Sequence, residues 1–162
     1  MRQTRAEVPI EQTWNLADLY PALTDWEAET ERLRSDLEQV VQFKGRLAEG
    51  ADTLLACLRQ YEGILERGVR WFTYASLLEA QEGCNPVNQE AGAKANALMA
   101  EFEAQTAFIK SEILALPDGQ VEAWIAENAG LAEYRPFLRL LLNDKPYLLH
   151  PETEEALAAL GE

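Results

Sequence analysis

The chain has 162 residues, a formal net charge of −14 and an isoelectric point near 4.5. Such an acidic surface repels the phosphates of nucleic acids and of anionic membranes, so both classes of ligand are disfavoured. Apolar residues make up 48% of the sequence, which is enough for a hydrophobic core and argues against disorder. His150 is the only histidine, so the sequence contains neither an HExxH motif nor a metal site built from two or three histidines.

The sequence also indicates a compartment. The N-terminal residues lack the apolar core of a secretory signal, and no apolar stretch approaches the roughly 18 residues that a membrane-spanning helix needs. Cys57 and Cys84 form no CxxC motif, and their spacing favours two free thiols over a disulfide. We therefore expect a cytoplasmic protein.

The first expected elements occupy the region before Gly45. Asn15 can cap a short helical turn over Leu16–Tyr20, which Pro21 ends. Thr24 and Glu27 have the spacing of a capping box and predict that a helix begins there. Its apolar stripe consists of Trp26, Thr30, Leu33, Leu37 and Val40. Outside that stripe we expect Glu29, Arg32, Asp36 and Gln39.

A long central helix is predicted from a cap at Asp52 to about Glu82. One apolar seam contains Leu54, Leu58, Tyr61, Leu65 and Phe72, and the adjoining seam contains Cys57, Ile64, Trp71, Ala75 and Leu78. A helix with so wide an apolar face is expected at the centre of its bundle. Gly63 and Gly68 each disfavour the helix by about 1 kcal/mol relative to alanine, which predicts the close approach of another helix there.

The remaining elements are also helical. Asn85 and Pro86 predict the start of a helix that runs to about Ala115. Its core side is expected to hold Ala91, Ala95, Leu98, Phe102, Ile109, Ile113 and Leu116. Shorter helices are expected from Pro117 to about 128–130, over 134–142, and from Pro151 with Leu157 and Leu160 on its apolar side. Without a stretch that alternates with period two, the sequence predicts an all-α helical bundle with two long antiparallel helices and several shorter helices.

Three residues are candidates for general-base or nucleophilic chemistry. His150 could act as a base, but its place just before a helix is more typical of a cap or a surface residue. Cys57 lies among apolar residues on a helix face, which is typical of a small buried side chain. Cys84 lies near a helix start, where a thiol pKa can fall, but no histidine is near it in the sequence. We assign no catalytic, cofactor-binding or metal-binding residue to this chain.

Carboxylate pairs and tryptophans offer weaker candidates. The pairs Glu27 with Glu31, Glu101 with Glu103, and Glu154 with Glu155 could act as acid and base, but solvated helix faces commonly carry such pairs. Trp14, Trp71 and Trp124 could line a ligand groove, although aromatic residues at helical spacing more often belong to a core.

A set of segments, in order along the chain, resembles a known family. The first is TWNLADLYP at Thr13–Pro21. It is followed by FKGRL at 43–47, YASL at 74–77, Asn85-Pro86, SEILAL at 111–116, EYRPFLRLLL at 133–142 and PETEEALAALGE at 151–162. Together they resemble the N-terminal region of oligoendopeptidase F and its relatives, in the thimet-oligopeptidase-like group of zinc metallopeptidases. Family members often read TWDLSDLY near their start, so Asn15 and Ala17 depart from that pattern.

The resemblance implies a larger parent enzyme. In that family, a later catalytic domain carries HExxH and a downstream glutamate that bind zinc, and the N-terminal helices form one wall of a channel that admits short peptides. The implied organisation is one helical N-terminal lobe over 1–162, with the catalytic part and an oligopeptide substrate as partners. The composition fits equally well a stand-alone acidic helical module that binds another protein through an apolar face, and an open reading frame continuing into HExxH would decide between them. The apolar segment from Phe137 to Leu149, with Leu157 and Leu160, predicts weak self-association.

Overall fold

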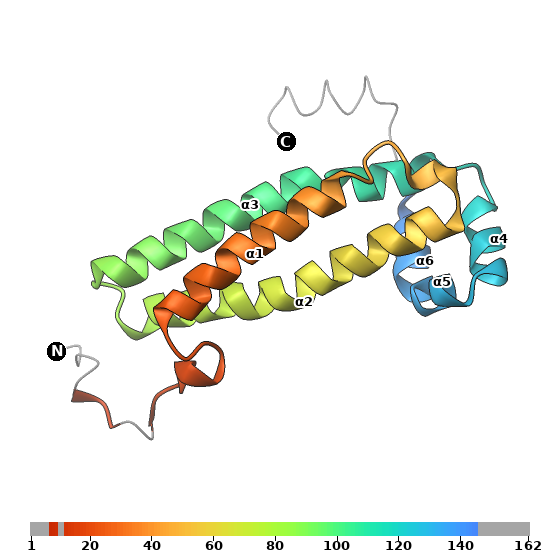
Figure 1. The fold of residues 1–162 in the computed structure, drawn as a ribbon. Coiled ribbons are helices and arrows are strands. Elements are labelled where there is room, and N and C mark those ends of the chain that lie inside the picture. The colour runs from red at the N-terminus through yellow and green to blue at the C-terminus, as the bar shows by residue number, and fades with distance from the viewer. Residues whose placement is uncertain (1–6, 10–11, 146–162) are drawn as a thin grey trace, which may run out of the picture.

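The computed structural model describes residues 7–9 and 12–145, and these residues confirm the all-α prediction. The three long helices are α1 (Leu23–Val41), α2 (Ala51–Gln81) and α3 (Pro86–Ala115). Figure 1 shows them side by side, with α2 antiparallel to both α1 and α3. The short helices α4 (Gln120–Glu127), α5 (Ala129–Glu133) and α6 (Arg135–Asp144) gather at the end of the bundle where α2 begins. No strand occurs in the described ranges.

The start of α1 differs from the predicted capping box at Thr24 and Glu27. The helix is capped two residues earlier, at Ala22, whose backbone N–H donates to the Asp25 carboxylate at 3.1 Å. Asp25 thus takes the role that was expected of Glu27, as the third residue of the helix whose carboxylate accepts from the cap residue's backbone N–H. The preceding turn is a short 3-10 segment, Leu16–Asp18, in which the Asn15 side chain donates to Asp18 at 2.8 Å and does not cap the backbone.

The predicted reason for Gly63 and Gly68 is wrong. A Cβ atom placed on either glycine would meet nothing within 4 Å, so no helix approaches them closely. The close approaches occur instead at Gly92, where Glu79 Oε2 lies 2.5 Å from the Cβ position, and at Gly130, where Leu55 Cδ2 lies 2.5 Å away. Gly130 is the more constrained of the two, because Leu55 comes from the packed side of α2 while the Glu79 carboxylate is the end of a flexible side chain.

The hairpin between α2 and α3 follows the prediction closely. Pro86 begins α3, and the Asn85 side chain accepts from the backbone N–H of Val87 at 3.0 Å. Asn88 is buried and donates its amide to the carbonyls of Leu78 (2.9 Å) and Glu82 (3.3 Å). These carbonyls also accept from the backbone N–H groups of Glu82 and Asn85, so the Asn88 amide adds a second donor to each and ties the start of α3 to the end of α2.

Glu112 of α3 anchors the connection between α1 and α2. Its carboxylate accepts from the backbone N–H groups of Gly45 (2.5 Å) and Leu47 (3.2 Å). Gly45 has a φ of +80°, a conformation that favours glycine, and Leu47 is fully buried next to it. The charged acceptor therefore holds a left-handed turn against the bundle and positions one core leucine.

The small helices at the end of the bundle are attached to α2 by polar contacts. Asp52 does not cap α2, which begins at Ala51 after Gly50; it accepts instead from the Asn128 side chain at 2.8 Å. The Tyr134 hydroxyl donates to Glu62 at 2.5 Å. In α6, Leu138 is buried, but Leu140 is 67% exposed. The helix expected after Pro151 lies outside the described residues.

Candidate functional site

A buried aromatic pair joins α1 to α2 in the core. Trp26 of α1 stacks on Trp71 of α2 with ring centroids 5.0 Å apart and an interplanar angle of 4°. The Trp26 indole N–H donates to the backbone carbonyl of Trp71 at 2.9 Å, and the Trp71 indole N–H donates to the Thr30 hydroxyl at 2.8 Å. Both rings are 1% exposed, so both indole donors are satisfied inside the core. Trp71 is therefore a core residue, as the helical spacing indicated.

An apolar groove opens beside this pair, between α2 and α3, with α1 at its base. It is shallow, with a cavity volume of about 40 Å³. Its lining comprises Leu33 and Leu37 of α1, Ile64, Leu65, Gly68, Val69 and Trp71 of α2, and Leu98, Met99 and Phe102 of α3. No titratable side chain lies among these residues, so the groove can hold apolar groups but has no acid, base or nucleophile of its own.

The mouth of the groove exposes apolar side chains of α2. Val69 is 63% exposed and Leu65 is 38% exposed. Leu65 was expected within the core seam of the central helix, and that expectation is wrong because neither α1 nor α3 covers this side of α2. An α2 side chain is missing at Gly68, which is where the groove gains space.

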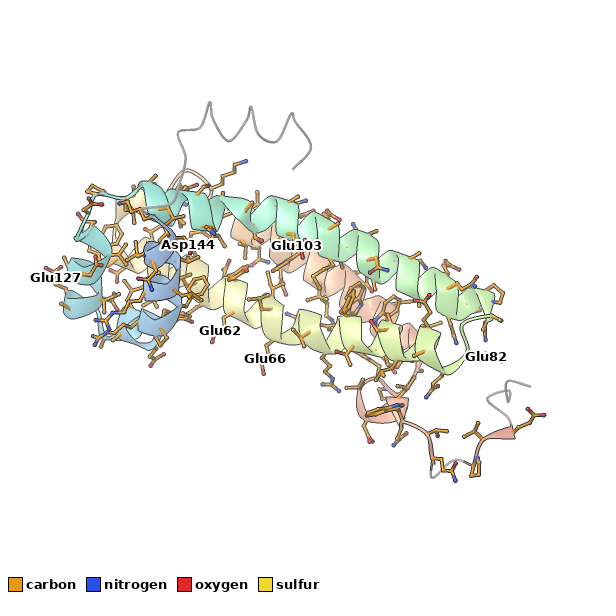
Figure 2. All side chains as sticks on the ribbon, turned by 180° about the vertical axis from the view of Figure 1, so that it is seen from behind. Glu62, Glu66, Glu82, Glu103, Glu127 and Asp144 are labelled. Carbon is orange, nitrogen blue, oxygen red and sulfur yellow. The ribbon has the colours of Figure 1, made fainter. Side chains whose placement is uncertain are left out.

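Carboxylates flank this mouth on both helices. Figure 2 shows Glu62 and Glu66 on α2 and Glu103 on α3, on the side of the bundle where these two helices face the viewer. All three residues are exposed. Tyr61, stacked on the groove residue Phe102 at 5.6 Å, has its pKa raised by burial and by the nearby charge of Glu103. The groove therefore combines an apolar interior with an acidic border.

A separate ionic cluster lies on the α1 side of α2. The Arg67 guanidinium contacts Glu29 at 2.6 Å and Asp36 at 2.5 Å, and Arg32 contacts Glu29 at 3.4 Å. Glu29 was expected in solvent, but it is buried because α2 covers that side of α1. Burial acts to lower the pKa of Arg67, but the hydrogen bonds that Arg67 donates to Asp36 and Glu29, together with their charges, outweigh it, so the net shift of the pKa is upward. This cluster joins two helices and leaves Arg67 fully charged.

The cysteines stay separate, in agreement with the prediction of two free thiols. Cys57 is fully buried, and burial together with the charge of Glu112 raises its pKa to about 12. A thiol in that environment remains protonated and is a poor nucleophile. Cys84 is exposed in the turn between α2 and α3. His150, the third candidate, lies outside the described residues.

Members of the predicted carboxylate pairs take part in ion pairs with cations of neighbouring helices. Glu27 lies 3.9 Å from Lys94, and Glu101 forms an ion pair with Arg34 at 3.0 Å. Glu154 and Glu155 lie outside the described residues. Of the other tryptophans, Trp14 is 70% exposed and Trp124 is half-buried.

The described residues contain neither a metal-binding cluster nor a membrane-spanning helix. Within 7–9 and 12–145, no group of three or more histidine, cysteine, aspartate or glutamate side chains is placed to hold a metal ion. Over the same ranges, no helix combines the length and the apolar character needed to cross a membrane.

Comparison with known proteins places the chain beside a family of peptidases. The family described as Oligopeptidase F matches residues 112–162. Oligopeptidase PepF of Bacillus subtilis is 31% identical over 98% of this chain, and the plasmid-encoded oligoendopeptidase F of Lactococcus lactis is 31% identical over all of it. This chain matches the N-terminal region of oligoendopeptidase F. The resemblance predicted from TWNLADLYP and the later segments is thus confirmed.

The solved structures agree with the sequence comparison. The crystal structure of oligoendopeptidase F from Enterococcus faecium superposes on 87% of this chain with a TM-score of 0.72 and 25% identity. The match covers 28% of that structure, and the chain spans about a quarter of the length of the curated relatives: 24% of the Bacillus protein and 27% of the Lactococcus protein. Most of each oligoendopeptidase F relative therefore has no counterpart in this chain. The groove between α2 and α3 was not predicted from the sequence, and the only signal for it was the unusually wide apolar face of α2.

Proposed function

We propose that this chain is the non-catalytic N-terminal lobe, or an N-terminal fragment, of an oligoendopeptidase F-like zinc metallopeptidase that cleaves short peptides. The observation that carries the proposal is the match along essentially the whole chain to only the first quarter of such peptidases. In this role the three long helices form part of the wall of the substrate channel, and 1–162 acts as one helical domain.

The chain's own residues do not fit the zinc that the family uses. An HExxH motif needs two histidines, and the sequence has one. Zinc sites in peptidases normally take three protein ligands and one water. The zinc and the water-activating glutamate accordingly belong to a catalytic domain beyond these residues, and we assign no catalytic step to this chain.

The partners follow from the same proposal. The first partner is the catalytic part of the enzyme, and the second is an oligopeptide held between the two parts. We place the protein in the cytoplasm, and the two free thiols support a reducing compartment.

The alternative is a stand-alone acidic helical module that binds another protein through one apolar face. The exposed groove residues Val69 and Leu65 suit this function as well as the first. The two functions differ in what the gene encodes after Glu162. An open reading frame that continues into HExxH supports the peptidase lobe, and a stop codon at that point supports the module.

A biochemical test uses the purified chain. We expect no stoichiometric zinc by elemental analysis and no cleavage of a quenched fluorescent peptide, because the ligand set is missing. If the separately produced remainder of the enzyme is added, we expect peptidase activity to appear. Metal-dependent turnover by the pure chain would contradict the proposal.

A further inference from the structure

The groove between α2 and α3 is an apolar surface that the chain leaves open. Most large apolar residues of the three long helices are buried, yet Val69 is 63% exposed and Leu65 is 38% exposed at the mouth of the groove. Behind them lie the buried side chains of Leu33, Leu37 and Leu98. Exposed apolar side chains gathered over a hollow are typical of a contact site.

The shape of the groove favours a helix as its occupant. Its two walls are antiparallel helices, and Figure 2 shows α2 and α3 running along each other on this side. A helix laid between two helices places its side-chain ridge in their shared groove and completes a four-helix arrangement. Gly68 adds space for such a ridge, since nothing lies within 4 Å of its Cβ position, and the flexible Met99 side chain adapts to different apolar groups.

The charges around the mouth of the groove favour basic residues on the flanks of that helix. Glu66 lies on α2 and Glu103 on α3, while Glu62 of α2 is already engaged as the acceptor of the Tyr134 hydroxyl. The nearby cations of α2 are already engaged elsewhere: Arg67 contacts Glu29 and Asp36, and Arg70 donates to the carbonyl of Leu19. An occupant with lysine or arginine beside its apolar face is therefore favoured. A second copy is disfavoured, because it carries the same carboxylates and a net charge of −14.

We propose that this groove docks an amphipathic helix with basic flanks, supplied by the polypeptide that follows this region in the longer relatives. The inference rests on the proposed function, since it needs a parent protein longer than this chain. The relatives contain enough additional chain, because the match covers only 24–27% of their length. The groove is then part of the interface between the N-terminal lobe and the rest of the enzyme.

The test measures binding of a defined probe to the purified chain by isothermal titration calorimetry. The probe is a synthetic peptide of about 18 residues, with leucines three and four positions apart on one face and lysines on both flanks. We expect saturable binding in the calorimeter. In an NMR titration with the same peptide, we expect a shift of the Met99 methyl resonance. Val69→Glu should weaken binding at least about tenfold, because it places a charge in the apolar mouth. Val87→Glu is the matched control: Val87 is a 50% exposed valine of α3 outside the groove, and its substitution should change the affinity less than about twofold.

Further measurements separate the possible occupants. Exchanging the peptide's lysines for glutamates should weaken binding, and so should combining Glu66→Lys with Glu103→Lys in the protein. Added salt should reduce the difference in affinity between the lysine peptide and the glutamate peptide. Equal binding of a peptide interrupted by proline would identify an extended oligopeptide as the occupant and overturn the proposal. A dimer in sedimentation that Val69→Glu abolishes would identify a second copy and also overturn it, as would failure of the lysine-flanked peptide to bind. None of these results depends on what the gene encodes after Glu162, so the groove and the proposed function can fail separately.

Discussion

Replacing Trp71 with alanine tests whether the aromatic pair is the centre of the core. Trp71 is 1% exposed, stacks on Trp26 and donates its indole N–H to Thr30. The substitution removes all three contributions at once: buried apolar area, ring stacking and a buried hydrogen bond. It leaves the backbone carbonyl that accepts from Trp26, so the change is confined to the side chain.

The magnitude can be estimated from these contacts. A buried tryptophan removes roughly 150–250 Å² from water, which corresponds to about 4–6 kcal/mol at about 25 cal/mol per Å². Residual structure in the unfolded chain lowers this figure, while loss of the stacking and of the Thr30 bond each raise it by about 1 kcal/mol. Because the groove lies beside the ring, neighbouring side chains can close part of the cavity. We therefore expect a loss of about 4 kcal/mol, within the range of about 3–5 kcal/mol for buried aromatic residues.

Urea unfolding followed by circular dichroism at the helical band measures this loss. The wild type should show a helix-dominated spectrum and one cooperative transition, and Trp71→Ala should lower the midpoint with little change in slope. Trp14→Ala is the control, because Trp14 is 70% exposed and its removal should cost less than about 0.5 kcal/mol. A loss below about 1 kcal/mol for Trp71→Ala would refute the placement of Trp71 in the core.

Two further predictions concern single polar contacts. Glu112→Ala should destabilise the chain by about 2 kcal/mol, because it leaves the backbone N–H groups of Gly45 and Leu47 without their charged acceptor. Hydrogen exchange at those two amides should become faster. Glu103→Ala, on the same helix, is the control and should not change their exchange. Burial, and then the hydrogen bond to Glu62, raises the pKa of Tyr134 to about 12 from an ordinary value near 10, so the folded state retains this proton longer than the unfolded state. Its contribution to stability is therefore complete below pH 10 and falls as the pH rises from 10 to about 12, and Tyr134→Phe should flatten that part of a stability–pH curve.

The sequence predicted most of the long helices because their signals are local. Asn85 and Pro86 mark the start of α3, and the structure begins the helix at Pro86 and ends it at Ala115. The cap and the proline each act through the backbone within one turn, so no distant residue can overrule them. The prediction of a capping box at Thr24 was wrong although its signal is also local, because Asp25 serves as the acceptor for a helix start two residues earlier, at Ala22.

The features that depend on distant residues could not be predicted in the same way. Glu29 has the spacing of a solvent-facing residue in α1, but Arg67, 38 positions later, buries it against α2. Leu65 has the spacing of a core residue in α2, yet it lies at the mouth of the groove because no third helix covers it. Helical periodicity reports which residues share a face, and only the tertiary arrangement decides what covers that face.

Tertiary packing also decides how strongly the chain can self-associate through its C-terminal part, which the sequence predicts from the apolar run over Phe137–Leu149. In α6 the bundle covers part of this run: Leu138 is buried and Leu141 is half-buried, so Leu140, at 67% exposure, is the large apolar side chain left open there. One exposed leucine gives a weak contact, and the net charge of −14 opposes it, so association should appear only at high protein concentration and should strengthen as added salt screens the charge. Sedimentation at several protein and salt concentrations measures this, and Leu140→Glu should abolish it while Val69→Glu leaves it unchanged. If the chain sediments as a strict monomer in all conditions, α6 needs no partner, and the stand-alone module gains support over the peptidase lobe.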